Sequence, residues 1–309
     1  MKHTGEILLA TLWIIIAAIL TGFLSYGLYK GHSVWKATNI FNYFDKCEAV
    51  DEQTFSYTFD ATKIDSIETE LTNDNVEVMP YNGNEILVEI TSNMPEKYRA
   101  KAFAKGTTLC VESKELYNIL NWNIYKNSVV IKLPYSFAAN SNHLYEIKTV
   151  SGEISITDIA GNSLEVKSTS GNISVSKCRM VSSEMTTVSG EIKTESCEIK
   201  EVDVKSTSGE ILVDCNSDDI EFGTISGNIT FCANKMPVEK IEAESVSGSV
   251  SFKLPENNGY TFEYKTTSGS VKDDFLNFHA ENSGRSSYKS GSCKVKAKTV
   301  SGSISILKN

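Results

Sequence analysis

Cysteine is the residue type whose spacing in this sequence could carry chemistry, because thiols form disulfides, bind soft metals and act as nucleophiles. Seven cysteines occur in the 309 residues, and no two form a Cys-x-x-Cys pair. A zinc site or a thioredoxin-type motif is therefore not indicated. Four cysteines follow one another at intervals of 19, 18 and 17 residues: Cys178, Cys197, Cys215 and Cys232. Such intervals predict that their side chains stack along one edge of a repetitive fold.

Two interpretations of this cysteine column remain open. Small thiols often fill an apolar interior. Alternatively, neighbouring repeats bring two cysteines within the Cα separation of about 4.4–6.8 Å that a disulfide requires. The odd number of cysteines and the parallel stacking of their side chains favour free thiols, and burial would make these thiols react slowly.

Signs of catalysis are weak elsewhere in the sequence. The four histidines are scattered, and none lies at metal-ligand spacing from another: His3, His32, His143 and His279. The carboxylate pairs Asp218-Asp219 and Asp273-Asp274 could act on a polysaccharide, but both fall in predicted turns, where aspartate is common. The sequence therefore predicts a protein that is not an enzyme and has no catalytic, cofactor-binding or metal-binding residue.

The elements that position these groups come from a repeat. A Ser-Gly dipeptide recurs at spacings of 19, 19, 19, 18, 21, 21 and 33 residues, with its glycine at Gly152, Gly171, Gly190, Gly209, Gly227, Gly248, Gly269 and Gly302. Apolar and polar residues alternate on both sides of each dipeptide, which is the period of half-buried strands. The residue two places after each glycine is β-branched and apolar: Ile154, Ile173, Ile192, Ile211, Ile229, Val250, Val271 and Ile304.

This pattern predicts an all-β, single-stack β-solenoid, or β-helix, with coils of about 19–21 residues. Each coil would be two short strands joined at a Ser-Gly corner, and stacking would bury the apolar positions of neighbouring coils against one another. Glycine suits the corner because it permits a positive φ or a close approach of two backbones.

Two polar columns accompany the corners. The residue three places before each glycine carries a hydroxyl: Thr149, Ser168, Thr187, Ser206, Thr224, Ser245, Thr266 and Thr299. We expect these hydroxyls to bond neighbouring coils, with a binding stripe as the alternative. The residue after each glycine begins as Glu153, Asn172, Glu191 and Glu210. We interpret this second column as a solvated face, with a cation or a basic partner as the alternative.

The repeat continues upstream in a degenerate form. Residues 67–78 superimpose on residues 164–175, with Asn73-Asp74 in place of Ser170-Gly171. We assign residues 55–140 to N-terminal coils and a cap, and residues 141–309 to regular repeats, within one domain. The aromatic-rich insertion at 114–125 is interpreted as a packed cap, or alternatively as a loop that touches a membrane or a partner. The extra length at 273–292 predicts a long loop or an extra strand pair.

A membrane segment precedes the repeats. Residues 7–29 contain no charged side chain, and this length is sufficient for one transmembrane α-helix. Because no small-residue cleavage site follows, we expect an uncleaved anchor rather than a signal peptide. Residues 1–6 would form a short tail and residues 30–54 a juxtamembrane linker. Lys30 and Lys36 slightly favour a cytoplasmic repeat domain, although long domains translocate regardless of such charges.

Composition limits the partners. The formal net charge is −9, which argues against a nucleic-acid-binding protein, since such proteins show a basic face. Charged residues make up only 22% of the chain, which argues against an acidic disordered chain.

The repeated runs TVSGEISI, STSGNISV, TVSGEIKT and STSGEILV, with the upstream strand IDSIET at 64–69, resemble the bacterial "putative adhesin" family. The resemblance covers roughly residues 55–309. It implies a right-handed solenoid, often tethered near the cell envelope, and it supplies no catalytic residue.

We therefore expect a single-pass cell-membrane protein whose solenoid is extracytoplasmic. The solenoid would be a non-catalytic surface for adhesion, binding or scaffolding, with a protein or a glycan as its ligand. The alternatives are a cytoplasm-facing regulatory or sensory domain and, less favoured, a polysaccharide-active solenoid enzyme.

Overall fold

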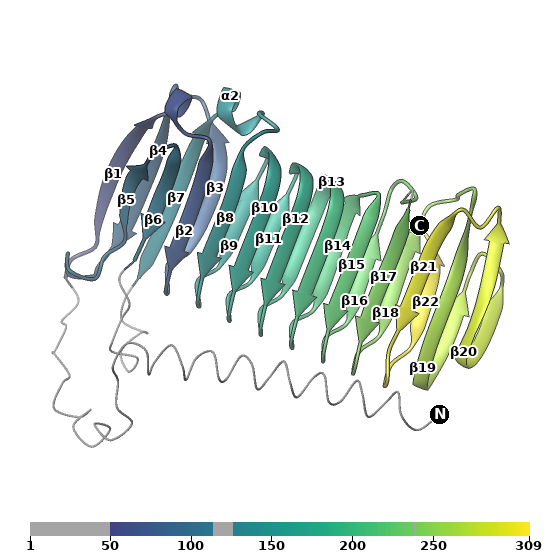
Figure 1. Cartoon of the computed structure of the whole chain (residues 1–309). Coiled ribbons are helices and arrows are strands. Elements are labelled where there is room, and N and C mark those ends of the chain that lie inside the picture. Colours follow the sequence, from purple (N-terminus) through teal and green to yellow (C-terminus); the bar gives the residue numbers. More distant parts are fainter. Residues whose placement is uncertain (1–49, 114–125, 238) are drawn as a thin grey trace, which may run out of the picture. The chain divides into compact units, whose positions relative to one another are not determined.

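The computed structural model describes residues 50–113, 126–237 and 239–309. These residues belong to one compact unit, Ala49–Asn309, in which a continuous β-sheet winds into a solenoid (Figure 1). Each regular coil gives one strand to each of two faces. The chain turns from face 1 to face 2 at the Ser-Gly corners, which form the Ser-Gly edge, and turns back along the opposite return edge. The predicted all-β solenoid is confirmed.

Face 1 consists of the strands that lead into the Ser-Gly corners. In spatial order they are β5 (Lys101–Lys105), β6 (Thr108–Glu112), β2 (Ser66–Leu71), β8 (Leu144–Thr149), β10 (Ala160–Ser168), β12 (Arg179–Thr187), the second part of β13 (Ile192–Ser206), β15 (Asp219–Thr224), β17 (Lys240–Ser245), β21 (Cys293–Lys298), the first part of β19 (Gly259–Asp273) and the second part of β20 (Phe278–Lys289).

Face 2 consists of the strands that leave the corners. In spatial order they are β1 (Gln53–Asp60), β4 (Glu85–Ser92), β7 (Asn127–Pro134), β3 (Asn75–Tyr81), β9 (Ile154–Thr157), β11 (Ile173–Ser176), the first part of β13, β14 (Ile211–Asn216), β16 (Ile229–Cys232), β18 (Val250–Leu254), β22 (Ile304–Lys308), the last part of β19 and the first part of β20. Two single turns of helix, η2 (Ala61–Lys63) and α2 (Tyr135–Ala138), follow β1 and β7.

The core lies between the two faces and runs from Ile64 to Ile306 as one cluster of buried side chains. The β-branched residues predicted to be inward are buried, and equivalent residues of successive coils are direct partners, as in Ile173 with Ile192 and Ile192 with Ile211. The period-2 alternation of the sequence therefore assigns the inward and outward positions correctly.

The glycines of the Ser-Gly edge are required by a close approach of backbones. A Cβ built on Gly209 would lie 1.7 Å from the carbonyl oxygen of Gly190, and one on Gly171 would lie 1.7 Å from that of Gly152. None of the repeat glycines has a positive φ among the described residues. Positive φ instead occurs at the return edge, on Asp158, Lys177 and Ser196. Of the two reasons considered for glycine, the structure supports close approach.

The buried hydroxyl column acts mainly within its own coil. The backbone N–H of Gly171 donates to Ser168 Oγ at 2.8 Å, and that of Gly209 donates to Ser206 Oγ at 2.8 Å. The expected bonds between coils also occur, since the Thr299 hydroxyl donates to the carbonyl oxygen of Gly248 at 3.0 Å. The column is thus a device that holds the corner and not a binding stripe.

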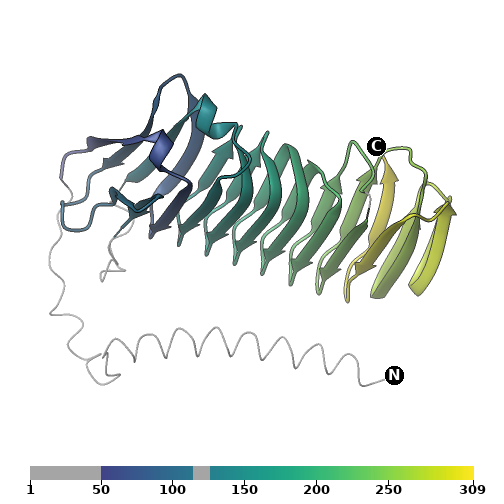
Figure 2. The ribbon, with the colours of Figure 1, turned by 45° about the horizontal axis from the view of Figure 1, so that its top comes forward.

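The coils at both ends are out of sequence order, which the repeat pattern did not predict. The last coil of the chain, β21–β22, pairs with β17–β18 on one side and with β19 on the other. At the opposite end the degenerate coil β2–β3 lies between β6–β7 and β8–β9. At the C-terminal end the chain therefore builds the outer layer β19 and then returns to fill the place inside it, whereas at the N-terminal end it forms β2–β3 first and then adds a coil on each side (Figures 1 and 2).

The extra length near the C-terminus forms an antiparallel strand pair, β19 with β20. The prediction that Asp273 lies in a turn is wrong. This residue is fully buried at the end of β19. Its carboxylate oxygens accept from the Tyr260 hydroxyl at 2.7 and 2.8 Å, and Oδ1 accepts from the backbone N–H of Phe275 at 3.0 Å. A buried carboxylate is tolerated because these donors replace its water.

Within the described residues, no helix is long and apolar enough to cross a membrane. The transmembrane helix predicted for residues 7–29 and most of the predicted linker lie outside the described residues, as does the insertion at 114–125.

Replacing Gly209 by alanine should destabilise the solenoid, because the new methyl group collides with a backbone carbonyl that cannot move without distorting a coil. We expect a loss of at least about 2 kcal/mol and a lower Tm in thermal denaturation. Gly223→Ala is the matched control, since its Cβ would meet no atom closer than Lys205 Cγ at 3.6 Å. Equal melting temperatures for the two variants would contradict this account of the corner.

Asp74 occupies the corner of the degenerate coil in place of glycine. Its side chain is buried, and burial raises the pKa of its carboxyl to about 6 although nearby backbone amides and Ser113 oppose the shift. The carbonyl oxygen of Asp74 lies only 1.8 Å from the position that a Cβ on Gly152 would take. The degenerate corner therefore keeps the close approach and adds a titratable group.

The free energy of unfolding should fall as the pH rises from about 4 to about 6, and Asp74→Asn should remove this part of the dependence. In that window the folded protein binds a proton at Asp74 that the unfolded chain has lost, so raising the pH favours unfolding. The expected difference is on the order of 2 kcal/mol, measured by urea denaturation of both proteins at each pH. Parallel pH profiles would show that Asp74 is not responsible.

Candidate binding surface

The outward side of face 1 carries charged side chains in straight columns. From β6 to β19 its strands are parallel and in register, so outward residues of successive coils are direct neighbours. Parallel strands lie about 4.8 Å apart, which sets the repeat distance of each column. A column that keeps the same type of residue therefore presents the same chemistry at regular intervals.

The middle column is almost entirely acidic. It occupies the position six places before each glycine and contains seven consecutive carboxylates, one lysine and a final carboxylate: Glu68, Glu146, Glu165, Glu184, Asp203, Glu221, Glu242, Lys296 and Glu263. The repulsion between such neighbours requires compensation by nearby cations.

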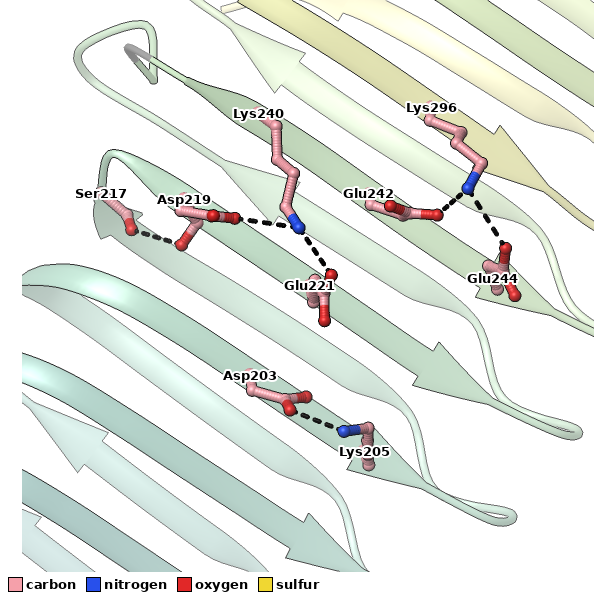
Figure 3. Close-up of polar contacts among 9 residues, drawn as sticks. All are labelled: Asp203, Lys205, Ser217, Asp219, Glu221, Lys240, Glu242, Glu244 and Lys296. Carbon is pink, nitrogen blue, oxygen red and sulfur yellow. Dashed lines mark hydrogen bonds and ion pairs between the residues drawn. The ribbon is translucent and has the colours of Figure 1, made fainter.

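Lysines on the flanking columns supply this compensation. Lys167 Nζ lies 2.6 Å from Glu165 and 3.6 Å from Glu184, so one ammonium bridges two coils. Lys240 Nζ lies 2.6 Å from Glu221 and 3.5 Å from Asp219 (Figure 3). The pairs form a network along the solenoid, which makes them more effective than isolated surface pairs.

The pKa values on this surface shift in the direction that such pairing predicts. The Lys240 ammonium lowers the pKa of Glu221, and the same contact raises the pKa of Lys240. Burial raises the pKa of Glu244, but Lys298 and Lys296 outweigh it, and the net shift is downward. These carboxylates are held in their charged form.

The out-of-order coil is the basic member of the stack. Its three outward residues on face 1 are Lys294, Lys296 and Lys298. Lys296 forms ion pairs with Glu242 and, at 3.7 Å, with Glu244, and Lys298 lies 2.7 Å from Glu244 (Figure 3 shows the Lys296 pairs). Lysine thereby separates Glu242 from Glu263, which would be adjacent if the coils followed the chain order.

The cysteine column lies inside the return edge. Cys197 and Cys215 are direct partners in neighbouring coils, and the backbone N–H of Glu198 donates to the carbonyl oxygen of Cys178, which puts Cys178 in the same column. These three side chains are buried, Cys232 is partly exposed, and all four are free. Burial raises the pKa of Cys215 and Cys232. Slow reaction of these thiols remains a prediction.

The remaining candidate residues do not converge. Asp219 pairs with Lys240, and Asp274 pairs with Lys272 at 2.8 Å. His143 stacks on Phe137, with ring centroids 3.7 Å apart, and its Nδ1 lies 3.1 Å from the carbonyl oxygen of Asp65. In the part of the chain that the structure describes, no three His, Cys, Asp or Glu side chains are grouped so as to hold a metal ion.

The outward column after the corner glycines is built into the backbone network. The side-chain oxygen of Asn172 accepts from the backbone N–H of Glu191 at 2.9 Å, and that of Asn228 accepts from Ser249 at 3.0 Å. The asparagines of this column therefore join neighbouring coils, which favours a structural role for the column over a cation site.

Sequence reasoning missed the acidic column of face 1. Its signal was present, because the residue six places before each Ser-Gly glycine is acidic in every repeat except the last, where it is Lys296. The stacking register is needed to show that these acidic residues are neighbours on one surface.

The chain belongs to the family described as Toastrack DUF4097, whose model matches residues 64–307. The resemblance to adhesin-like solenoids found in the sequence is thereby confirmed. No curated protein matches the chain significantly.

Several solved structures are similar to it at low identity. A "putative adhesin" from Parabacteroides distasonis is 13% identical, with a TM-score of 0.47 and coverage of 83% of this chain and 98% of that one. One from Bacteroides fragilis is 14% identical, with a TM-score of 0.43 and coverage of 82% and 97%. A "putative lipid binding protein" from P. distasonis is 15% identical, with a TM-score of 0.44 and coverage of 83% and 96%.

Reversing the charge of Lys296 should weaken the stack. Lys296→Glu places a carboxylate between Glu242 and Glu263, and we expect a loss of about 1 kcal/mol at low ionic strength. The difference in Tm from the unmodified protein should shrink in 0.5 M salt, because screening acts on exposed charges. Lys193→Glu on face 2, where Lys193 lies 3.6 Å from Glu195, is the control and should change the Tm little. A loss at Lys296 that salt leaves unchanged would argue against an electrostatic origin.

Proposed function

We propose that the chain is a single-pass, membrane-anchored and non-catalytic solenoid that presents a rigid binding or scaffolding surface at the bacterial cell envelope. In this proposal residues 1–6 form a tail, residues 7–29 the anchor, residues 30–54 the linker and residues 55–309 the presented domain. The ligand is a protein or a glycan that runs along face 1.

The observation that carries the proposal is the register of face 1. Its acidic column repeats over successive coils with the same spacing, and lysines on the flanking columns pair with it at several of these coils. An extended partner with a matching repeat would meet the same contact many times, and the strength of binding would grow with the number of coils engaged. Side chains already held by ion pairs lose little freedom on binding.

The pKa shifts on face 1 do not favour a polysaccharide-active enzyme site there. A glycoside hydrolase needs one carboxyl group whose pKa is raised so that it can donate a proton. On face 1 the pKa values of Glu165, Glu221 and Glu244 are all lowered by lysine. The charge pattern thus suits recognition better than proton transfer.

A cytoplasm-facing regulatory domain is the second candidate. The free thiols of Cys178, Cys197 and Cys215 suit a reducing compartment, and Lys30 and Lys36 favour the same side. The burial of these thiols weakens the first point, because a thiol enclosed in the core is shielded from oxidants on either side of the membrane.

Protease treatment of intact cells distinguishes the two candidates. We expect the solenoid, followed with an antibody to its C-terminal coil, to be released or degraded without permeabilisation, while a cytoplasmic marker stays intact. The expected cleavage region is the proposed linker, residues 30–54.

Protection of the solenoid until the cells are permeabilised would reject the envelope surface and support the cytoplasmic alternative. A chain in which residues 7–29 are replaced by a polar linker is the control for anchoring, and it should appear in the soluble fraction.

A further inference from the structure

Three strands of the described domain have a partner on one side only. They are β1 and β5 at the N-terminal end of the solenoid and β20 at the C-terminal end (Figure 1). The free side of an edge strand presents unpaired N–H and C=O groups, which accept a further strand unless charges, bulges or short length prevent it.

Two of these edges carry such protection. β5 has only five residues and carries Lys101 and Lys105 at its two ends. β20 is long, but it exposes charged side chains along its length, among them Glu281 and Arg285. It also pairs irregularly with β19, with a register shift between Lys265 and Ser270, and Asn282 has a φ of 69°.

The edge of β1 lacks these devices. It is eight residues long, pairs with β4 in continuous register from Gln53 to Asp60, and contains neither proline nor lysine. Its outward residues between the ends are Thr54, Ser56 and Thr58, all exposed and uncharged. Its one charge, Asp60, is at the last position and pairs with Lys63 at 3.1 Å.

The inward side of β1 is an incompletely covered row of aromatic rings. Phe55, Tyr57 and Phe59 alternate along the strand and are only half-buried, and the latter two pack against the end of the core. The Arg99 guanidinium lies over the Phe55 ring, 3.4 Å from its centroid. Its Nε atom is buried and has no hydrogen-bond partner within the described residues. This end of the solenoid therefore resembles an open layer.

We propose that β1 is an interaction edge that pairs antiparallel with β1 of a second copy of this chain, centred on Tyr57. In this register Phe55 of one copy lies opposite Phe59 of the other, Tyr57 lies opposite Tyr57, and Ser56 lies opposite Thr58. Directly opposed residues then point to the same side of the sheet, as an antiparallel pair requires. Two solenoids joined in this way share one continuous sheet on face 2.

A second copy fits this edge better than an unrelated strand because the edge is self-complementary. Aromatic residues face aromatic residues across the two-fold axis, and such cross-strand pairs are among the favourable ones. The uncharged outward row meets itself without repulsion. A two-fold axis also closes the assembly at two copies, since the described part of each chain has only one such edge.

The register is tested by oxidative cross-linking of the full chain in detergent micelles. Cysteines at directly opposed positions lie within disulfide range, whereas diagonal positions are about 7–8 Å apart. Protein with Ser56→Cys mixed with protein with Thr58→Cys should form disulfide dimers under copper phenanthroline. Neither variant alone should exceed the unmodified chain, whose native cysteines set the background. Equal cross-linking of one variant alone, or no cross-linking of the mixture, would overturn the proposed pair.

Paired lysine substitutions test the edge independently. Ser56→Lys with Thr58→Lys sets two lysines against each other at both opposed positions, and it should weaken the dimer at least tenfold in light scattering without lowering the Tm. Ser283→Lys with Ser287→Lys on β20 is the matched control and should leave the dimer unchanged. A dimer that survives the β1 substitutions, or an unmodified chain that stays monomeric at about 100 μM, would reject β1 as the interface.

Discussion

The rest of the structure depends on one contact, in which each Ser-Gly glycine lies against a backbone carbonyl group of a neighbouring coil. A side chain at Gly171, Gly190 or Gly209 would occupy the position of that carbonyl group. With glycine, successive corners stack at the strand spacing and the coils stay in register on both faces. The buried ladder of isoleucines, the cysteine column and the acidic column of face 1 all follow from this one alignment.

The two surfaces of the solenoid make different use of the same register. On the inside, identical apolar residues stack favourably, as Ile173, Ile192 and Ile211 do. On the outside, identical carboxylates repel, so lysines on flanking positions and in the coil β21–β22 must intervene. A repeat that is ideal for the core thus brings like charges together on the surface, and the lysines that offset this repulsion give face 1 its charge pattern.

Much of the regular part of the fold could be predicted from the sequence because its information is local. The alternation around each Ser-Gly dipeptide assigned the inward positions, and Asn73-Asp74 revealed a degenerate corner. The order of the end coils could not be predicted, because it depends on which strand edges pair and not on any single repeat. Asp273 was misassigned for a similar reason: its burial depends on Tyr260, thirteen residues earlier and on the other face of the coil. The acidic column was readable in the repeats but gained meaning only from the stacking.

The coil β21–β22 forms an interior layer of the stack although its residues come late in the sequence. Asn309 is held between coils, with its backbone N–H donating to the carbonyl oxygen of Leu254 at 2.9 Å and its side chain to that of Ala233 at 3.0 Å. Gly259, with a φ of 128°, begins β19 and lies against the end of β20, where a Cβ on it would be 2.2 Å from the carbonyl oxygen of Tyr288. Residues 293–309 fill the place between β17–β18 and β19, so this place stays open in a nascent chain until they have been synthesised. A chain cut short before Cys293 would lack an interior layer rather than an outer one and would expose two strand edges to proteases. Loss of this one coil therefore opens the stack instead of shortening it.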